Sequence, residues 1–158
     1  YKPDIISEIS EYLQELINKE SDLILDTAGK TVIRFTSYVI DNKIEKVGEG
    51  WTPSKRIVLF EFSNYEIRLV LRLYIGPGDR ELRGKLLDFF KAKSELFKVA
   101  DKKFGKKWHS VYQKEFLRKK DCEDKNIEDL KPIIKKRFDD FLKEDLKNIN
   151  NYFEQEWV

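Results

Sequence analysis

Residues 57–78, IVLFEFSNYEIRLVLRLYIGPG, determine the fold class of this chain. From residue 67 onward an apolar side chain stands at every second position, which is the period of a β-strand with one buried face. The preceding run, residues 57–62, predicts a second strand, and residues 63–66 predict the turn between the two. The sequence therefore predicts an antiparallel hairpin. Its second strand is expected to bury Ile67, Leu69, Leu71, Leu73 and Ile75 and to turn Arg68, Val70, Arg72 and Tyr74 to the opposite, wetter face.

Helices are expected on both sides of this hairpin, because apolar residues recur there at helical spacing. The first covers residues 4–19. Downstream, residues 76–78 end the strand, and Asp79 can cap a helix over residues 80–98. Pro132 is expected to open a long C-terminal helix, since proline is favoured at the first helical position. The apolar face of that helix consists of Ile134, Phe138, Phe141, Leu146, Ile149, Phe153 and Trp157.

Three further segments read as extended, namely residues 23–26, 31–35 and 108–117. Residues 27–30 predict a turn between the first two. These elements predict an α+β fold in which an antiparallel sheet of about three to four strands, with a central hairpin, is flanked by helices. We expect residues 1–158 to form a single domain.

Two connections are less regular. Thr36 or Ser37 can cap a short helix over residues 38–42, and the spacing of apolar side chains also permits a longer helix that passes Ile44. Residues between the last strand and the C-terminal helix predict a polar loop that contains Cys122.

The composition places the chain among intracellular domains. It begins at Tyr1 and contains no Met, so we expect it to be a domain excised from a longer protein. No apolar run approaches the roughly 20 residues that a membrane helix needs. A single Cys excludes an intramolecular disulfide, and one Cys with one His argues against a structural zinc site. We therefore expect a cytoplasmic domain with no membrane contact.

Three strings carry a resemblance to a known family. The first, residues 48–87, contains GEGWT, FEF and IGPG followed by an R-x-x-L helix, and the others are residues 105–117 and 128–146. They resemble the C-terminal region of bacterial PD-(D/E)XK nuclease-like proteins, of the restriction-endonuclease-like superfamily. The resemblance implies that a nuclease core lies upstream, that the parent protein is a DNA endonuclease using Mg²⁺, and that it acts in defence against foreign DNA.

The catalytic set of that family is not expected in this chain. The set needs an Asp and then a Glu-x-Lys on adjacent strands, where the carboxylates hold a divalent metal. Glu61 has no Lys two residues later, and Glu123 with Lys125 has the right spacing but lies in a polar loop. We therefore predict no catalytic residue, no metal ligand and no cofactor in residues 1–158, and no nuclease activity of the chain alone.

The basic residues give the one candidate binding surface. The basic excess lies almost entirely within residues 91–120, whereas the regions before and after it are acidic. Clustered cations can hold phosphates, and an aromatic among them can stack on an unpaired base. The alternative is a solvated Lys-rich loop with the Trp in the core, and the two ends of the strand would lie about 30 Å apart. The candidates for DNA contact are Lys102, Lys103, Lys106, Lys107 and Trp108 before the strand, Arg118, Lys119 and Lys120 after it, and Arg80 and Arg83 on the preceding helix.

Other chemically notable residues favour structural roles. His109 has no paired nucleophile or acid, Cys122 lies between carboxylates that oppose a reactive thiolate, and Trp51 is expected to pack as a lid on the sheet. Residues 76–80 form a glycine loop before a helix, but Asp79 would fill any anion site there. The sequence thus predicts an accessory domain that supports a nuclease core or grips DNA. The alternative is a protein–protein interaction or oligomerisation module with no nucleic-acid contact.

Overall fold

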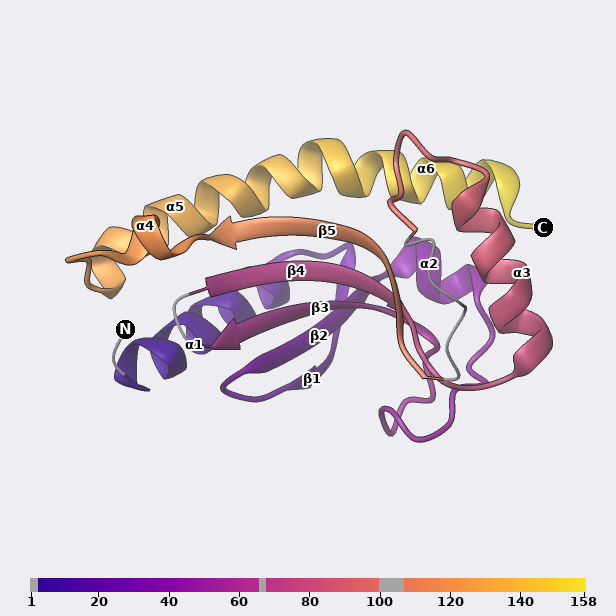
Figure 1. Ribbon diagram of the computed structural model, residues 1–158, viewed down its shortest axis with the longest axis horizontal. Coiled ribbons are helices and arrows are strands. Elements are labelled where there is room, and N and C mark those ends of the chain that lie inside the picture. The colour runs from indigo at the N-terminus through magenta and orange to yellow at the C-terminus, as the bar shows by residue number, and fades with distance from the viewer. Residues whose placement is uncertain (1–2, 66–67, 100–106) are drawn as a thin grey trace.

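The computed structural model describes residues 3–65, 68–99 and 107–158, and within these its strands form one five-stranded antiparallel sheet (Figure 1). Each strand pairs with the next along the chain, so the sheet is a simple meander. The predicted α+β class is confirmed. The predicted number of strands, about three to four, was too low, because both short extended segments before the central hairpin join the sheet. The strands are β1 (Leu23–Ala28), β2 (Val32–Ser37), β3 (Val58–Tyr65), β4 (Arg68–Ile75) and β5 (His109–Leu117).

Two helical layers cover one face and one end of this sheet. Helix α1 (Pro3–Lys19) contacts β1, β2 and β3, and it packs beside α5 (Ile127–Asp140), which itself contacts β5. A π-helical segment, η1 (Phe141–Leu146), joins α5 to α6 (Lys147–Glu156), so that one long C-terminal helix runs along the sheet (Figure 1). The remaining helices are α2 (Tyr38–Lys43), which contacts α6, α3 (Arg80–Lys91), which contacts β4, and α4 (Lys119–Cys122), which follows β5.

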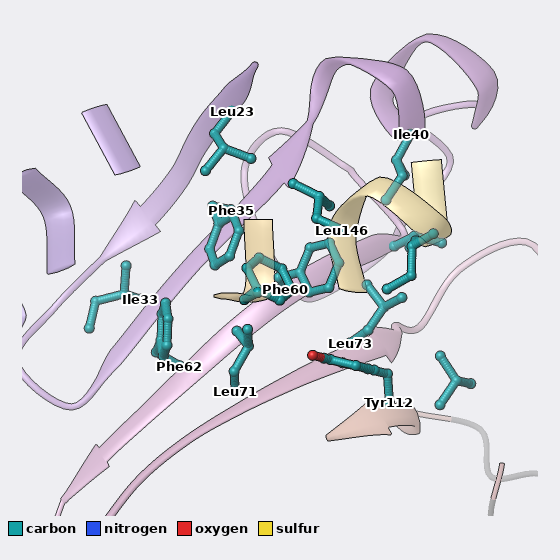
Figure 2. Packing of buried hydrophobic residues seen from close by; sticks show 14 of the residues in the cluster. Leu23, Ile33, Phe35, Ile40, Phe60, Phe62, Leu71, Leu73, Tyr112 and Leu146 are labelled. Atoms are coloured by element: carbon teal, nitrogen blue, oxygen red, sulfur yellow. The ribbon is translucent and has the colours of Figure 1, made fainter. Parts of the chain in front are cut away.

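The core lies between the sheet and these helices and is built on aromatic rings. Phe35 of β2 stacks on Phe60 of β3 with ring centroids 5.2 Å apart, and Phe141 of the C-terminal helix meets Phe60 edge-on at 5.3 Å. Figure 2 shows Phe35, Phe60 and Phe62 in one row on the inner face of the sheet. Such pairs stabilise by about 0.5–1.5 kcal/mol beyond the area they bury.

The predicted register of the central hairpin is confirmed where it is described. Leu69, Leu71, Leu73 and Ile75 are fully buried on the inner face, and Ile67 lies outside the described residues. Arg68 and Arg72 project from the other face. No helix of the described residues packs over that outer face, and we call it the open face of the sheet.

Two predicted boundaries in the middle of the chain were wrong. The turn predicted at residues 63–66 starts too early, because β3 continues to Tyr65. Asn64 allows this: its buried side-chain amide donates to the carbonyl oxygens of Ile6 (2.9 Å) and Lys30 (3.0 Å), so a residue that favours turns is held within a strand. The helix capped by Asp79 ends at Lys91, not near residue 98, and the chain then turns so that Phe97 packs on Phe90.

Two boundaries near the C-terminus also differ. Pro132 lies inside α5 and does not open it, because Asn126 caps the helix further upstream and exchanges hydrogen bonds with Asp129. Cys122 belongs to the short helix α4, where a loop was predicted. The short-helix prediction over residues 38–42 is confirmed, with Ser37 as the cap; the helix does not pass Ile44.

The π-helical segment keeps the apolar stripe of the C-terminal helix on one side. The stripe has spacings of three or four residues except between Phe141 and Leu146, which are five apart. In a regular α-helix five residues would rotate the second side chain by roughly 140° from the first. In a π-helix the hydrogen bonds join residues five apart, so Phe141 and Leu146 stay on the same face, and both are buried.

This reading predicts opposite effects of length changes in η1. Deleting the exposed Lys143 shortens the spacing between Phe141 and Leu146 to four residues, which a regular α-helix accommodates. The deletion should lower the free energy of unfolding by only about 1–2 kcal/mol, because the hydrogen bond from Tyr112 to Asp145 is lost. Inserting one Ala after Lys143 should cost more than about 5 kcal/mol, since Leu146, Ile149 and Phe153 leave the core at about 2–5 kcal/mol each. Urea denaturation of both variants measures this, and equal losses would contradict it.

Candidate nucleic-acid interface

The structure places the first half of the basic cluster at the start of β5. Lys107 and Trp108 are exposed there, and the Trp108 side chain is 46% accessible, so the alternative that put this ring in the core is wrong. The Lys107 ammonium stands 6.0 Å from the centre of the Trp108 ring. Lys102, Lys103 and Lys106 lie outside the described residues.

Arg83 anchors this position from behind. It is buried, and its guanidinium donates to the carbonyl oxygen of Gly76 (Nε, 2.8 Å) and to that of Lys107 (Nη2, 2.6 Å). Burial lowers the pKa of its guanidinium. Arg83 therefore ties the glycine turn after β4 to the chain that leads into β5. The prediction that it reaches outward to phosphates was wrong, whereas Arg80 is exposed in the first turn of α3.

The second half of the basic cluster stands at the other end of β5. Arg118, Lys119 and Lys120 are exposed where α4 begins (Figure 1). The length of β5 keeps these three residues apart from Lys107, so the basic residues do not form one cluster. Their neighbours across the sheet are Arg68 and Tyr65, because Leu69 pairs with Leu117 and Tyr65 pairs with Arg68.

Sequence reasoning missed Tyr65, which it assigned to a turn. Its side chain is 55% exposed at the end of β3. The partner residue Arg68 is half-exposed and donates to Glu115 of β5 at 3.1 Å. Only the register between β3 and β4 shows that an aromatic ring and a guanidinium lie side by side here.

A row of polar side chains crosses the open face between these two ends. Arg34 donates to Glu61 (2.8 Å) and to Thr27 (3.2 Å), and Arg72, directly opposite Glu61, donates to Gln113 (3.1 Å). One carboxylate thus stands between two guanidinium groups. The row therefore carries an excess of positive charge.

The glycine motifs of the chain pack on each other at one end of this face. Gly48 bridges to Gly78, and Trp51 covers Gly76 so closely that a Cβ on Gly76 would lie 2.1 Å from the indole. The Trp51 ring also meets Tyr74 edge-on and lies under the Arg34 guanidinium. The lid predicted for Trp51 is confirmed, and residues 76–78 form a structural turn in which Asp79 accepts from the Leu82 amide.

The residues with catalytic spacing are not arranged as a metal site. Glu123 and Lys125 are both exposed in the connection between α4 and α5, and Glu61 is paired with Arg34. Among the described residues, no three His, Cys, Asp or Glu side chains gather as a cation site would require. Within the same ranges no helix is long and apolar enough to cross a lipid bilayer.

His109 and Cys122 have altered acidities with structural causes. Burial lowers the pKa of His109, and the positive charges of Lys91 and Arg83 lower it further. Burial raises the pKa of the Cys122 thiol, and Asp121 adds to that effect. Neither group has the environment of a reactive nucleophile or base.

Comparison with protein-family models, with curated proteins and with solved structures found no match to this chain. The resemblance to PD-(D/E)XK nuclease-like proteins therefore rests on the sequence motifs alone. The structure gives those motifs a packing role, because GEGWT and IGPG form the clamp of Gly48, Trp51, Gly76 and Gly78.

The lowered pKa of His109 predicts a pH dependence of stability. An unfolded His titrates near 6.5, so below about pH 6.5 the unfolded chain binds a proton that the folded chain does not, and the free energy of unfolding falls with falling pH. The chain has one His, and ordinary carboxylates titrate near 4. Urea denaturation between about pH 5.5 and 7.5 should show this slope in the native chain and a flat line in His109→Gln. The same slope in both would contradict the assignment.

Proposed function

We propose that this chain is an accessory domain that contacts nucleic acid within a larger PD-(D/E)XK nuclease-like protein. The catalytic core and its Mg²⁺ belong to the upstream part of that protein in this proposal. The observation that carries it is the exposed Trp108 beside Lys107, at the end of the most basic segment of the chain. An exposed indole next to an ammonium group can stack on a base and attract a phosphate, whereas exposure of the ring to water is unfavourable.

The anchoring by Arg83 supports a binding role for this position. Its two hydrogen bonds fix the carbonyl oxygens of Gly76 and Lys107, so the backbone that presents Trp108 is ordered before any ligand arrives. A preorganised site loses less conformational entropy on binding. Lysine side chains then supply phosphate contacts that need no fixed geometry, and the ring supplies a stacking surface.

The charge of the helical layer favours the sheet side as the contact surface. A hollow along α1 and α5 is lined by Glu8, Glu11, Glu15 and Glu128, with Lys131 as its only basic lining residue within the described parts of the chain. A phosphate backbone is repelled there. The polyanion therefore approaches from the open face and the basic ends of β5.

The proposal predicts a specific salt dependence of DNA binding. Four duplex phosphate contacts by Lys102, Lys103, Lys106 and Lys107 would give a slope of about −3.6 for log affinity against log salt. The double variant Lys106→Ala/Lys107→Ala should flatten it by about 1.8, equally for different DNA sequences. The matched control is Lys135→Ala/Lys136→Ala, which removes two exposed cations from α5 and should leave the slope unchanged. Binding titrations at several salt concentrations supply the measurement.

Two outcomes would count against this function. Equal flattening by both double variants would mean that the attraction is diffuse and that the β5 end is no site. Undetectable binding at low salt, where attraction between opposite charges is strongest, would favour the interaction or oligomerisation module instead.

A further inference from the structure

We propose that the open face of the sheet, from Trp108 to Tyr65, is a track for single-stranded nucleic acid. This inference rests on the proposed function and narrows it from nucleic acid in general to unpaired strands. The track is defined by Trp108 at the start of β5, the Arg34–Glu61–Arg72–Gln113 row across the middle, and Tyr65, Arg68 and Arg118 at the far end.

Exposed aromatic rings stand near both ends of the open face. Trp108 directly precedes β5, whose first two residues, His109 and Ser110, pair with Ile75 on the inner face and with Tyr74 on the open face. Tyr65 stands on the open face by its pairing with Arg68. The nine residues of β5 separate the two rings along the strand direction, a length of about 30 Å. A surface that binds about 4–16 nucleotides, as single-strand binding domains do, fits this length.

The charge between the rings complements a phosphate backbone. Glu61 lies between Arg34 and Arg72, and Arg72 donates to the uncharged Gln113, so this row holds one carboxylate for two guanidinium groups and has a positive excess. Arg68 pairs with Glu115 but remains 52% exposed. Guanidinium groups spaced across a sheet can bind phosphates and stack on bases.

The aromatic rings select for unpaired strands. An exposed ring on a flat surface stacks on a base whose face is open, and in a duplex those faces are covered by the neighbouring base pairs. The sheet offers no helix to a major groove. The same face therefore discriminates by strandedness rather than by sequence.

Titration of fluorescent dT₁₅ and of a 15-base-pair duplex against the intact chain tests the track. We expect dT₁₅ to bind at least tenfold more tightly, and Tyr65→Ala and Trp108→Ala each to weaken its binding by about 5- to 150-fold, which corresponds to about 1–3 kcal/mol per stacked base. Tyr38→Ala is the matched control: Tyr38 is 51% exposed, but it lies on α2 beside Leu142 and Asn150 of the helical layer. It should bind as the native chain does. All three rings are exposed, so the variants should fold, and thermal melting verifies this.

The outcomes distinguish a failure of the single-strand track from a failure of the proposed nucleic-acid function. If both probes bind equally, Tyr65→Ala behaves as Tyr38→Ala, and the Lys106/Lys107 variant still flattens the salt slope, the track is wrong and the proposed function stands. If neither probe binds at low salt, the proposed function fails and the track fails with it, which leaves a protein partner as the occupant of this face.

Discussion

The contact between the aromatic side chains of the sheet and the C-terminal helix organises the fold. Phe35 and Phe60 stack on neighbouring strands, and Phe141 closes on both rings from the helix above them, at 6.3 and 5.3 Å. This contact fixes which face of every strand is buried, since a shift of one residue would turn all side chains over. The π-helical turn belongs to the same constraint, because without it Leu146, Ile149 and Phe153 would rotate away from the sheet that Phe141 touches.

Burying one face of the sheet leaves the other face for the proposed nucleic-acid contact. Helices α1 and α5 pack side by side over the inner face, so the alternating residues on the open face are available to form the Arg34–Glu61–Arg72–Gln113 row. The Trp51 clamp holds one end of this face, and Arg83 holds the chain that presents Trp108. The residues that resemble a nuclease family thus serve packing, and the proposed contact residues lie beside them.

The sequence predicted the elements whose signals are local. The alternation of residues 69–75 predicts the register of β4, and Asp79 is predicted as a cap because capping depends on adjacent residues. For the short helix α2 the sequence leaves Thr36 and Ser37 as alternatives, and the structure has Ser37 as the cap. Two local preferences gave wrong boundaries. Asn64 favours a turn, but its tertiary hydrogen bonds hold it in a strand, and Pro132 favours the first helical position, but Asn126 caps the helix upstream of it.

The sequence predicted only the part of the candidate site that a high density of basic residues marks. The basic run before β5 and after it is visible in the sequence, but the burial of Arg83 depends on the carbonyl of a residue 24 positions away. Tyr65 could be placed beside Arg68 and Arg118 only once the pairing of β3, β4 and β5 was known. The open face is a property of which helices pack where, and no single segment carries that information.

We propose that the helical layer supports the sheet and that the open face contacts nucleic acid. Amide chemical-shift mapping of the ¹⁵N-labelled chain during titration with dT₁₅ tests it most directly. We expect perturbations at the amides of β3, β4 and β5 that flank Arg72, Gln113 and Tyr65, together with Lys107 and Trp108, and none along the outer face of α1. Perturbations concentrated on α1 and α5, or an unchanged spectrum at low salt, would contradict it.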